Sequence, residues 1–132
     1  MSTAQQVLVS YGVIVLLLGL GLGTVLGFLR MSRPPIRTLS TAHVETLMQS
    51  SVVLGLAFAI GLVGFDSTWA TWGAALFAGG GAMQAAGVTL NWITDSTDQF
   101  ADRSPGFYLN SISTWPLLAG AIIIASGVLS NL

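Results

Sequence analysis

The chain has 132 residues, of which 53% are hydrophobic and only 7% are charged, and its formal net charge is −1. A soluble domain typically carries about 25% charged residues, so this composition excludes an ordinary soluble enzyme, a disordered tail and a basic protein that binds nucleic acid. It predicts an integral membrane protein whose outer surface contacts membrane lipid. The sequence contains no cysteine, which excludes disulfides and thiolate chemistry.

Four long stretches of the sequence carry no charged residue, and each could form a helix of about 20 residues that crosses a hydrocarbon core. Hydrocarbon admits only helices or closed barrels, and four continuous apolar stretches favour helices. We therefore expect an all-α fold, with residues 1–132 forming a single integral membrane four-helix bundle of up-down-up-down topology. The expected helices lie near 7–29, 42–64, 69–93 and 108–130.

The first expected helix carries glycines at four-residue intervals, at Gly19, Gly23 and Gly27. Such a stripe of small residues lets helix backbones approach closely in lipid. The stripe could serve packing within the bundle, packing between subunits, or contact with a flat cofactor. The sequence leaves these three interpretations open.

All four basic residues lie in the first and third loops, which share one side of a four-helix bundle. They are Arg30, Arg33, Arg37 and Arg103. The positive-inside rule places these loops, 30–41 and 94–107, in the cytoplasm and both termini on the opposite side.

The start of the second expected helix is the densest polar cluster and contains the only histidine of the chain, His43. Glu45 and Gln49 are four residues apart and share a helix face, whereas His43 lies on another side, so we expect them to contact different neighbours. We expect His43 near the helix N-terminus, where the helix dipole disfavours the imidazolium and leaves a neutral ring able to bind a metal. Polar groups are costly in hydrocarbon, so we interpret the cluster as a site; hydrogen bonding between helices is the alternative.

Two more polar residues point to the same half of the bundle. Gln84 and Asn91 lie seven residues apart on the third expected helix, on one stripe that also contains Asp95. Together with the polar first turns of the fourth expected helix, they place most of the membrane-embedded polarity toward the cytoplasm. The candidate site therefore lies in the cytoplasmic half.

A single histidine restricts metal chemistry. It excludes a bis-histidine haem within one chain and a three-ligand zinc site, but it permits one axial ligand to haem iron. Arg33, Arg37 and Arg103 are candidate partners for haem propionates on the same face.

The segment STAHVETLMQ, residues 40–49, resembles the Ala-His-x-Glu-x-x-Met-Asn segment of hydroxylaminobenzene mutases and, more loosely, the Ala-His segment of styrene oxide isomerases. Both families are small four-helix membrane proteins. Gln49 stands where they have asparagine, and Gln84 looks like a second replacement of this kind. The resemblance implies haem b at the subunit interfaces of a homotrimer, His43 as the axial iron ligand, and a location in the bacterial inner membrane.

The resemblance also implies an isomerase that acts on a small aromatic substrate. The haem iron would serve as a Lewis acid, and the hydroxyl of an arylhydroxylamine would move to the ring to give a 2-aminophenol. Gln49, Gln84 and Asn91 are candidates for orienting the migrating oxygen, and Glu45 completes the candidate catalytic set. Val88 stands where the epoxide isomerases carry a tyrosine, which favours the mutase activity.

Three alternatives remain from the sequence. The first is an isomerase that converts aryl epoxides to aldehydes. The second is a small proton-coupled transporter or channel subunit in which His43 and Glu45 relay protons. The third is a purely structural subunit of a larger complex.

Overall fold

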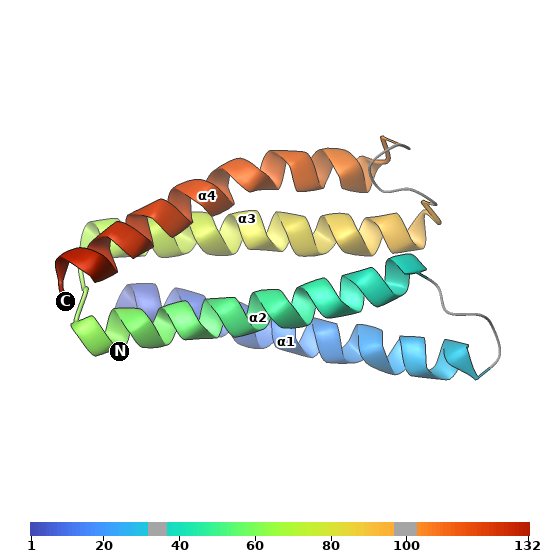
Figure 1. Cartoon of the computed structure of the whole chain (residues 1–132), viewed down its shortest axis with the longest axis horizontal. Helices are drawn as coiled ribbons and strands as arrows, with labels where there is room; N and C mark the ends of the chain where they lie inside the picture. Colours follow the sequence, from blue (N-terminus) through green and yellow to red (C-terminus); the bar gives the residue numbers. More distant parts are fainter. Residues whose placement is uncertain (32–36, 97–102) are drawn as a thin grey trace.

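The computed structural model describes residues 1–31, 37–96 and 103–132. Its helices are α1 (Thr3–Arg30), α2 (Arg37–Val63), α3 (Thr68–Ile93) and α4 (Pro105–Ser130). They run alternately in opposite directions as one bundle, and both chain ends lie at the same end of it (Figure 1). The predicted all-α, up-down-up-down architecture is confirmed.

The helices begin earlier than the hydropathy pattern predicts. Ser2, Ser67 and Ser104 cap α1, α3 and α4, because each side chain accepts a hydrogen bond from the backbone N–H three residues on. Ser2 also forms a capping box with Gln5. The helix α2 begins at Arg37, five residues before its predicted start. Polar residues at the helix ends are therefore helical although they interrupt the apolar pattern.

Three of the helices, α1, α2 and α4, are long and apolar enough to cross a membrane. The helix α3 has 26 residues, as α4 does, but its mean hydropathy is lower than that of a typical membrane-spanning helix. Glycines, Gln84 and Asn91 stand along α3 where the other helices carry aliphatic side chains. The composition and these three helices indicate an integral membrane protein.

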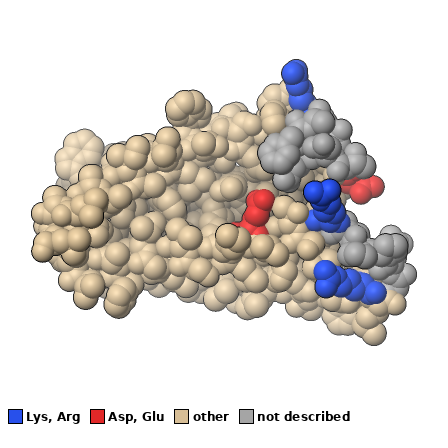
Figure 2. Space-filling view, viewed as in Figure 1, with Lys and Arg blue, Asp and Glu red and all other residues tan. Residues whose placement is uncertain are grey.

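On the face shown in Figure 2, charged side chains gather at the end of the bundle opposite the chain termini, apart from one acidic group that lies in a hollow. Asp66, between α2 and α3, lies at the other end, near the chain termini. Arg30 ends α1, Arg37 begins α2, and Arg103 precedes α4. Arg33 lies outside the described residues. The end of the bundle that carries Arg30, Arg37 and Arg103 is called the arginine end below.

The pair α1 and α2 is joined by three hydrogen bonds at seven-residue intervals, which we call the α1–α2 ladder. Gln5 Nε2 donates to Ala57 O at 3.3 Å, Ser50 Oγ donates to Gly12 O at 2.9 Å, and His43 Nδ1 lies 2.7 Å from Gly19 O. Each bond links a side chain to a backbone carbonyl. In a membrane, such bonds between helices stabilise a bundle by about 0.6–2 kcal/mol each.

The pair α3 and α4 packs through small residues that also recur every seven positions. A Cβ added at Gly80 would lie 2.7 Å from Leu117 N and 3.0 Å from Ser113 O. At Gly120 the added Cβ would lie 2.5 Å from Phe77 N and 2.7 Å from Gly73 O. The two backbones therefore touch along this seam, and no side chain could be inserted between them without moving a helix.

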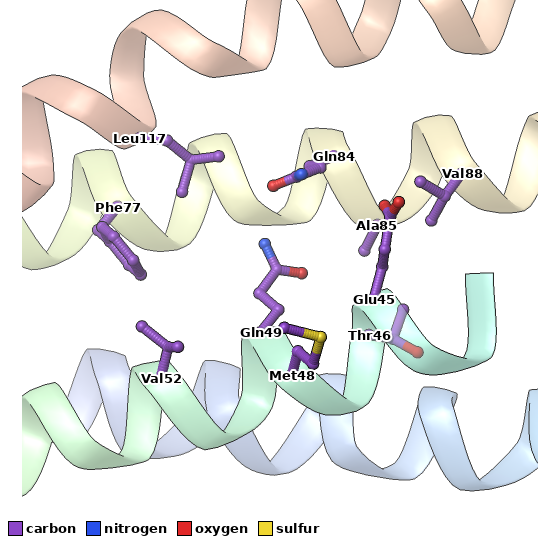
Figure 3. Close-up of a pocket in the computed structure, with 10 residues that line it drawn as sticks. All are labelled: Glu45, Thr46, Met48, Gln49, Val52, Phe77, Gln84, Ala85, Val88 and Leu117. Atoms are coloured by element: carbon purple, nitrogen blue, oxygen red, sulfur yellow. The ribbon is translucent and has the colours of Figure 1, made fainter. Parts of the chain in front are cut away.

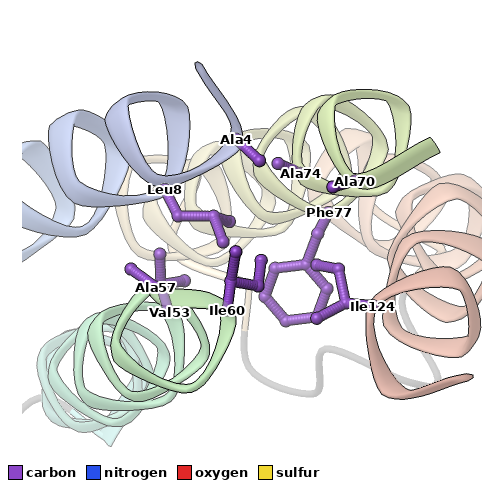
Figure 4. Close-up of a cluster of buried hydrophobic side chains, with 9 residues drawn as sticks. All are labelled: Ala4, Leu8, Val53, Ala57, Ile60, Ala70, Ala74, Phe77 and Ile124. Carbon is purple, nitrogen blue, oxygen red and sulfur yellow. The ribbon is translucent and has the colours of Figure 1, made fainter. Parts of the chain in front are cut away.

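Two clusters of buried side chains form the core. The smaller cluster lies toward the arginine end and contains Leu22, Leu26, Leu39, Ala42 and Val88. The larger cluster lies in the half of the bundle near the chain termini (Figure 4). Side chains from all four helices meet there, and its fully buried members include Leu8, Ile60 and Ile124. The helix α4 bends near its middle (Figure 1), where Pro116 removes a backbone hydrogen-bond donor. Contact between α2 and α4 is sparse, which leaves a groove between them toward the arginine end.

Candidate functional site

A groove of about 280 Å³ lies between α2, α3 and α4 (Figure 3). Glu45 and Gln49 of α2 extend toward α3, and Gln84 of α3 lies opposite Gln49. The rest of the lining is mostly apolar: Thr46, Met48, Val52, Phe77, Ala85, Val88 and Leu117. The groove thus offers an apolar space with the longer polar side chains of Glu45, Gln49 and Gln84 along its walls, while the Thr46 hydroxyl donates to backbone carbonyls of its own helix.

The structure separates the polar residues of α2 as predicted. Glu45 and Gln49 line the groove, whereas His43 faces α1 through its contact with Gly19. The prediction that the two sets contact different neighbours is confirmed. His43 and Glu45 do not form a hydrogen-bonded pair, and His43 does not line the groove.

Within the described part of the chain, no hydrogen bond or ion pair reaches the Glu45 carboxylate. Arg37 and Glu45 both border a second hollow of the surface. Arg37 nevertheless lies eight residues before Glu45 on α2, which is about 12 Å along the helix axis. Glu45 is therefore a carboxyl group with no partner among the described residues, near the start of the apolar length of α2, which marks it as a functional candidate.

Tyr11 is a polar residue of this region that the sequence analysis missed. Its hydroxyl is buried and has no hydrogen-bond partner among the residues that the structure describes. A Cβ added at Gly81 would overlap both this hydroxyl and the Gln49 amide nitrogen. Groups from α1 and α2 therefore approach the same point of the α3 backbone. A single tyrosine in an apolar helix looks like an ordinary core residue, and only the position of Gly81 on α3 reveals the contact.

The contact of His43 with α1 fixes its tautomer. A carbonyl oxygen can only accept a hydrogen bond, so Nδ1 carries the hydrogen that points to Gly19 O. In the neutral ring, Nε2 then holds the lone pair, and it has no hydrogen-bond partner in the described segments. Gly23 makes room for the ring, because an added Cβ would lie 2.5 Å from His43 Cε1 and 3.1 Å from Nε2.

The prediction that the dipole at the start of α2 keeps the His43 ring neutral is wrong. The helix α2 begins at Arg37, so His43 lies beyond the first turn, to which the favourable and unfavourable effects of the terminus are confined. The hydrogen bond to Gly19 O, and not the helix terminus, orients the ring.

Asn91 does not join Gln84 in the groove, although both lie on α3. It is 1% exposed, and its Oδ1 accepts a hydrogen bond from Ser104 Oγ, across the seam between α3 and α4. Within residues 1–31, 37–96 and 103–132, its Nδ2 has no hydrogen-bond partner. Gln84 and Asn91 therefore do not share one environment, as the predicted stripe on α3 implied. Two residues seven positions apart differ by about 20° around the helix, and α4 covers the part of the stripe near the arginine end.

Replacement of Ser104 by alanine should destabilise the protein by about 1–2 kcal/mol, because it removes the cap of α4 together with the bond to Asn91. Ser67→Ala is the matched control, since Ser67 Oγ caps α3 and makes no side-chain contact of this kind. Unfolding in detergent, followed by circular dichroism, measures both variants. If the two variants lost equal free energy of unfolding, the Asn91–Ser104 bond would have no stabilising effect.

Two predicted propionate partners lie at the arginine end. Arg37 and Arg103 are exposed, and Arg103 and Asp95 both have positive φ, at 41° and 53°. Arg33 lies outside the described residues. Among the residues that the structure describes, no group of three or more His, Asp or Glu side chains could hold a metal ion, so any metal held by His43 must bring most of its other ligands with it.

No protein-family model matches this chain, and searches of curated proteins and of solved structures find no match.

Proposed function

We propose that the protein is a membrane-embedded isomerase of small aromatic molecules that uses haem held by His43. The most favoured reaction is the rearrangement of an arylhydroxylamine to a 2-aminophenol, and an aryl epoxide isomerase is the second candidate. In this proposal all four helices cross a bacterial inner membrane with the arginine end in the cytoplasm. The helix α3 carries no charged residue over its 26 residues and packs along α4, which supports its inclusion as a fourth span.

The observation that carries the proposal is the hydrogen bond of His43 Nδ1 to Gly19 O at 2.7 Å. A histidine that binds a metal commonly donates its other ring N–H to a backbone carbonyl, which fixes the ring and makes the ligating nitrogen more basic. Ser50 and Gln5 complete their ladder contacts without an imidazole, so the ladder itself does not require a histidine. The ladder contact uses only Nδ1 of His43, so Nε2 is available to bind a metal.

The residues present fit a haem with one protein ligand. His43 would supply the axial nitrogen, and exposed Arg37 and Arg103 at the arginine end would be available to propionates. Haem iron bound there would supply a Lewis acid for the oxygen of an N–O bond or an epoxide. Because His43 does not line the groove, a flat group would lie against the outer face of α1 and α2, which supports a site completed by a second copy in the expected homotrimer.

Within one copy, His43 and the groove lie on different sides of α2, so in the proposed homotrimer the groove of a neighbouring copy would hold and orient the aromatic substrate. Val52, Phe77 and Leu117 bury an aromatic ring and keep water from it. The Gln49 and Gln84 amides each offer a donor and an acceptor to the oxygen or nitrogen of the substrate. Asn91 is engaged by Ser104, so the proposal gives it a structural role in place of the expected catalytic one.

The test is the absorption spectrum of protein purified from cells supplied with haem. The wild type should show a Soret band, and His43→Ala should lose it together with the conversion of phenylhydroxylamine. Ser50→Ala is the matched control, because it removes the neighbouring ladder bond and leaves the imidazole. A Soret band that survives in His43→Ala, or that Ser50→Ala loses equally, would contradict His43 as the ligand. Styrene oxide assayed in parallel distinguishes the two reactions.

A further inference from the structure

We propose that the groove between α2, α3 and α4 binds a small aromatic ammonium ion, whose charged nitrogen pairs with Glu45 and whose ring occupies the apolar end. This binding needs no haem and no turnover. It therefore goes beyond the proposed isomerase activity and makes Glu45 the residue that selects ligands by charge.

The first support is the electrostatic state of the groove. Glu45 borders it with no hydrogen bond or ion pair from any described residue. A carboxylate taken out of water is expensive unless a cation or several donors compensate it. Arg37 lies about two turns away along α2 and does not pair with it. No described residue compensates Glu45, and a cation that enters the groove from the membrane or from water would supply this partner.

The second support is the arrangement of the other polar groups. Gln49 and Gln84 face each other across the groove, and each amide oxygen can accept a hydrogen bond. An ammonium group has three N–H donors, so it could satisfy the Glu45 carboxylate and amide oxygens together. A bare metal ion is less well matched, because the described residues offer no cluster of three acidic or histidine ligands.

The third support is the size and access of the groove. Its volume of about 280 Å³ lies just below the usual 300–1,000 Å³ of sites for drug-sized ligands, which suits a ligand with one aromatic ring. Phe77, Val52 and Leu117 form the apolar end. The sparse contact between α2 and α4 opens the groove sideways, so an amphiphilic amine dissolved in the bilayer could enter directly.

The test compares benzylamine, which is protonated at pH 7, with benzyl alcohol, a neutral molecule of the same shape. Binding is measured by isothermal titration calorimetry on the full-length protein in a non-ionic detergent. Benzylamine should bind the wild type at least tenfold more tightly than benzyl alcohol does. Glu45→Gln should lower the benzylamine affinity at least tenfold and leave that of benzyl alcohol within about twofold.

Asp66→Asn is the matched control, because Asp66 is an exposed acid beyond α2 and does not line the groove. It should bind benzylamine as the wild type does. Equal binding of the two ligands, or an equal loss in Asp66→Asn and Glu45→Gln, would overturn the proposal. A folded Glu45→Gln is verified by its helical circular dichroism, and Glu45→Asp, which keeps the charge, should retain part of the selectivity. Protein without haem that still selects benzylamine would uphold this site even if the isomerase proposal failed.

Discussion

Replacement of Gly120 by alanine is expected to separate α3 from α4 and to lower the free energy of unfolding by about 2–3 kcal/mol. The added Cβ would meet Phe77 N, Gly73 O and Phe77 Cα at 2.5–2.9 Å. All three atoms belong to the backbone of α3, so no side chain can rotate to relieve the overlap, and one of the helices must shift. Overpacking of this kind typically costs about 1–3 kcal/mol. Unfolding in detergent by increasing denaturant measures the loss.

Gly79→Ala is the matched control for this change. Gly79 also lies within a helix and is exposed, and an added Cβ would meet nothing within 4 Å. Alanine is favoured over glycine inside a helix by about 1 kcal/mol, so this variant should be as stable as the wild type or slightly more stable. If Gly120→Ala proved equally stable, the close contact between the α3 and α4 backbones would be contradicted.

Replacement of Gly23 by alanine is expected to displace the His43 ring and to break its bond to Gly19 O. The added Cβ would lie 2.5 Å from Cε1, 2.8 Å from Nδ1 and 3.1 Å from Nε2 of that ring. If His43 binds haem as proposed, its affinity for haem should fall about 10–100-fold, the usual effect of losing the group that orients a ligating histidine. Haem transfer to apomyoglobin, followed at the Soret band, measures this affinity.

Gly27→Ala lies one turn further along the same glycine stripe and serves as the control, because an added Cβ there meets nothing within 4 Å. It should retain the affinity of the wild type for haem. The displacement can also be tested without haem, since His43 is the only histidine and its ring ¹⁵N resonances report the tautomer directly. Unchanged ¹⁵N shifts in Gly23→Ala would show that the ring does not need the space at Gly23.

Much of the fold follows from the sequence because its determinants are periodic or compositional. Charge-free stretches locate all four helices, and the 3.6-residue period correctly separates the face of Glu45 and Gln49 from that of His43. The helix starts do not follow from hydropathy. Four of residues 37–41 are polar, and α2 nevertheless includes them because a helix can extend beyond its apolar length toward water.

The site could be predicted only in part. Glu45, Gln49 and Gln84 come together in the groove, but Asn91 is engaged by Ser104 instead. That pairing depends on how α3 and α4 align across a turn, which periodicity within one helix does not specify. The approach of Tyr11 to Gln49 depends likewise on Gly81, because three helices must meet before an unremarkable tyrosine becomes a neighbour of the groove.

The α1–α2 ladder has a consequence for how this sequence can diverge. In two of the ladder contacts, the acceptor on α1 is a backbone carbonyl, Gly12 O or Gly19 O. Any amino acid at these positions would supply the same carbonyl. Substitutions at these positions therefore cannot be compensated by a change of polar partner on α2, and only residue size is constrained there. Correlated mutation between the two helices should be weak at the very positions that hold them in register, and a contact map inferred from covariation would leave this interface underrepresented.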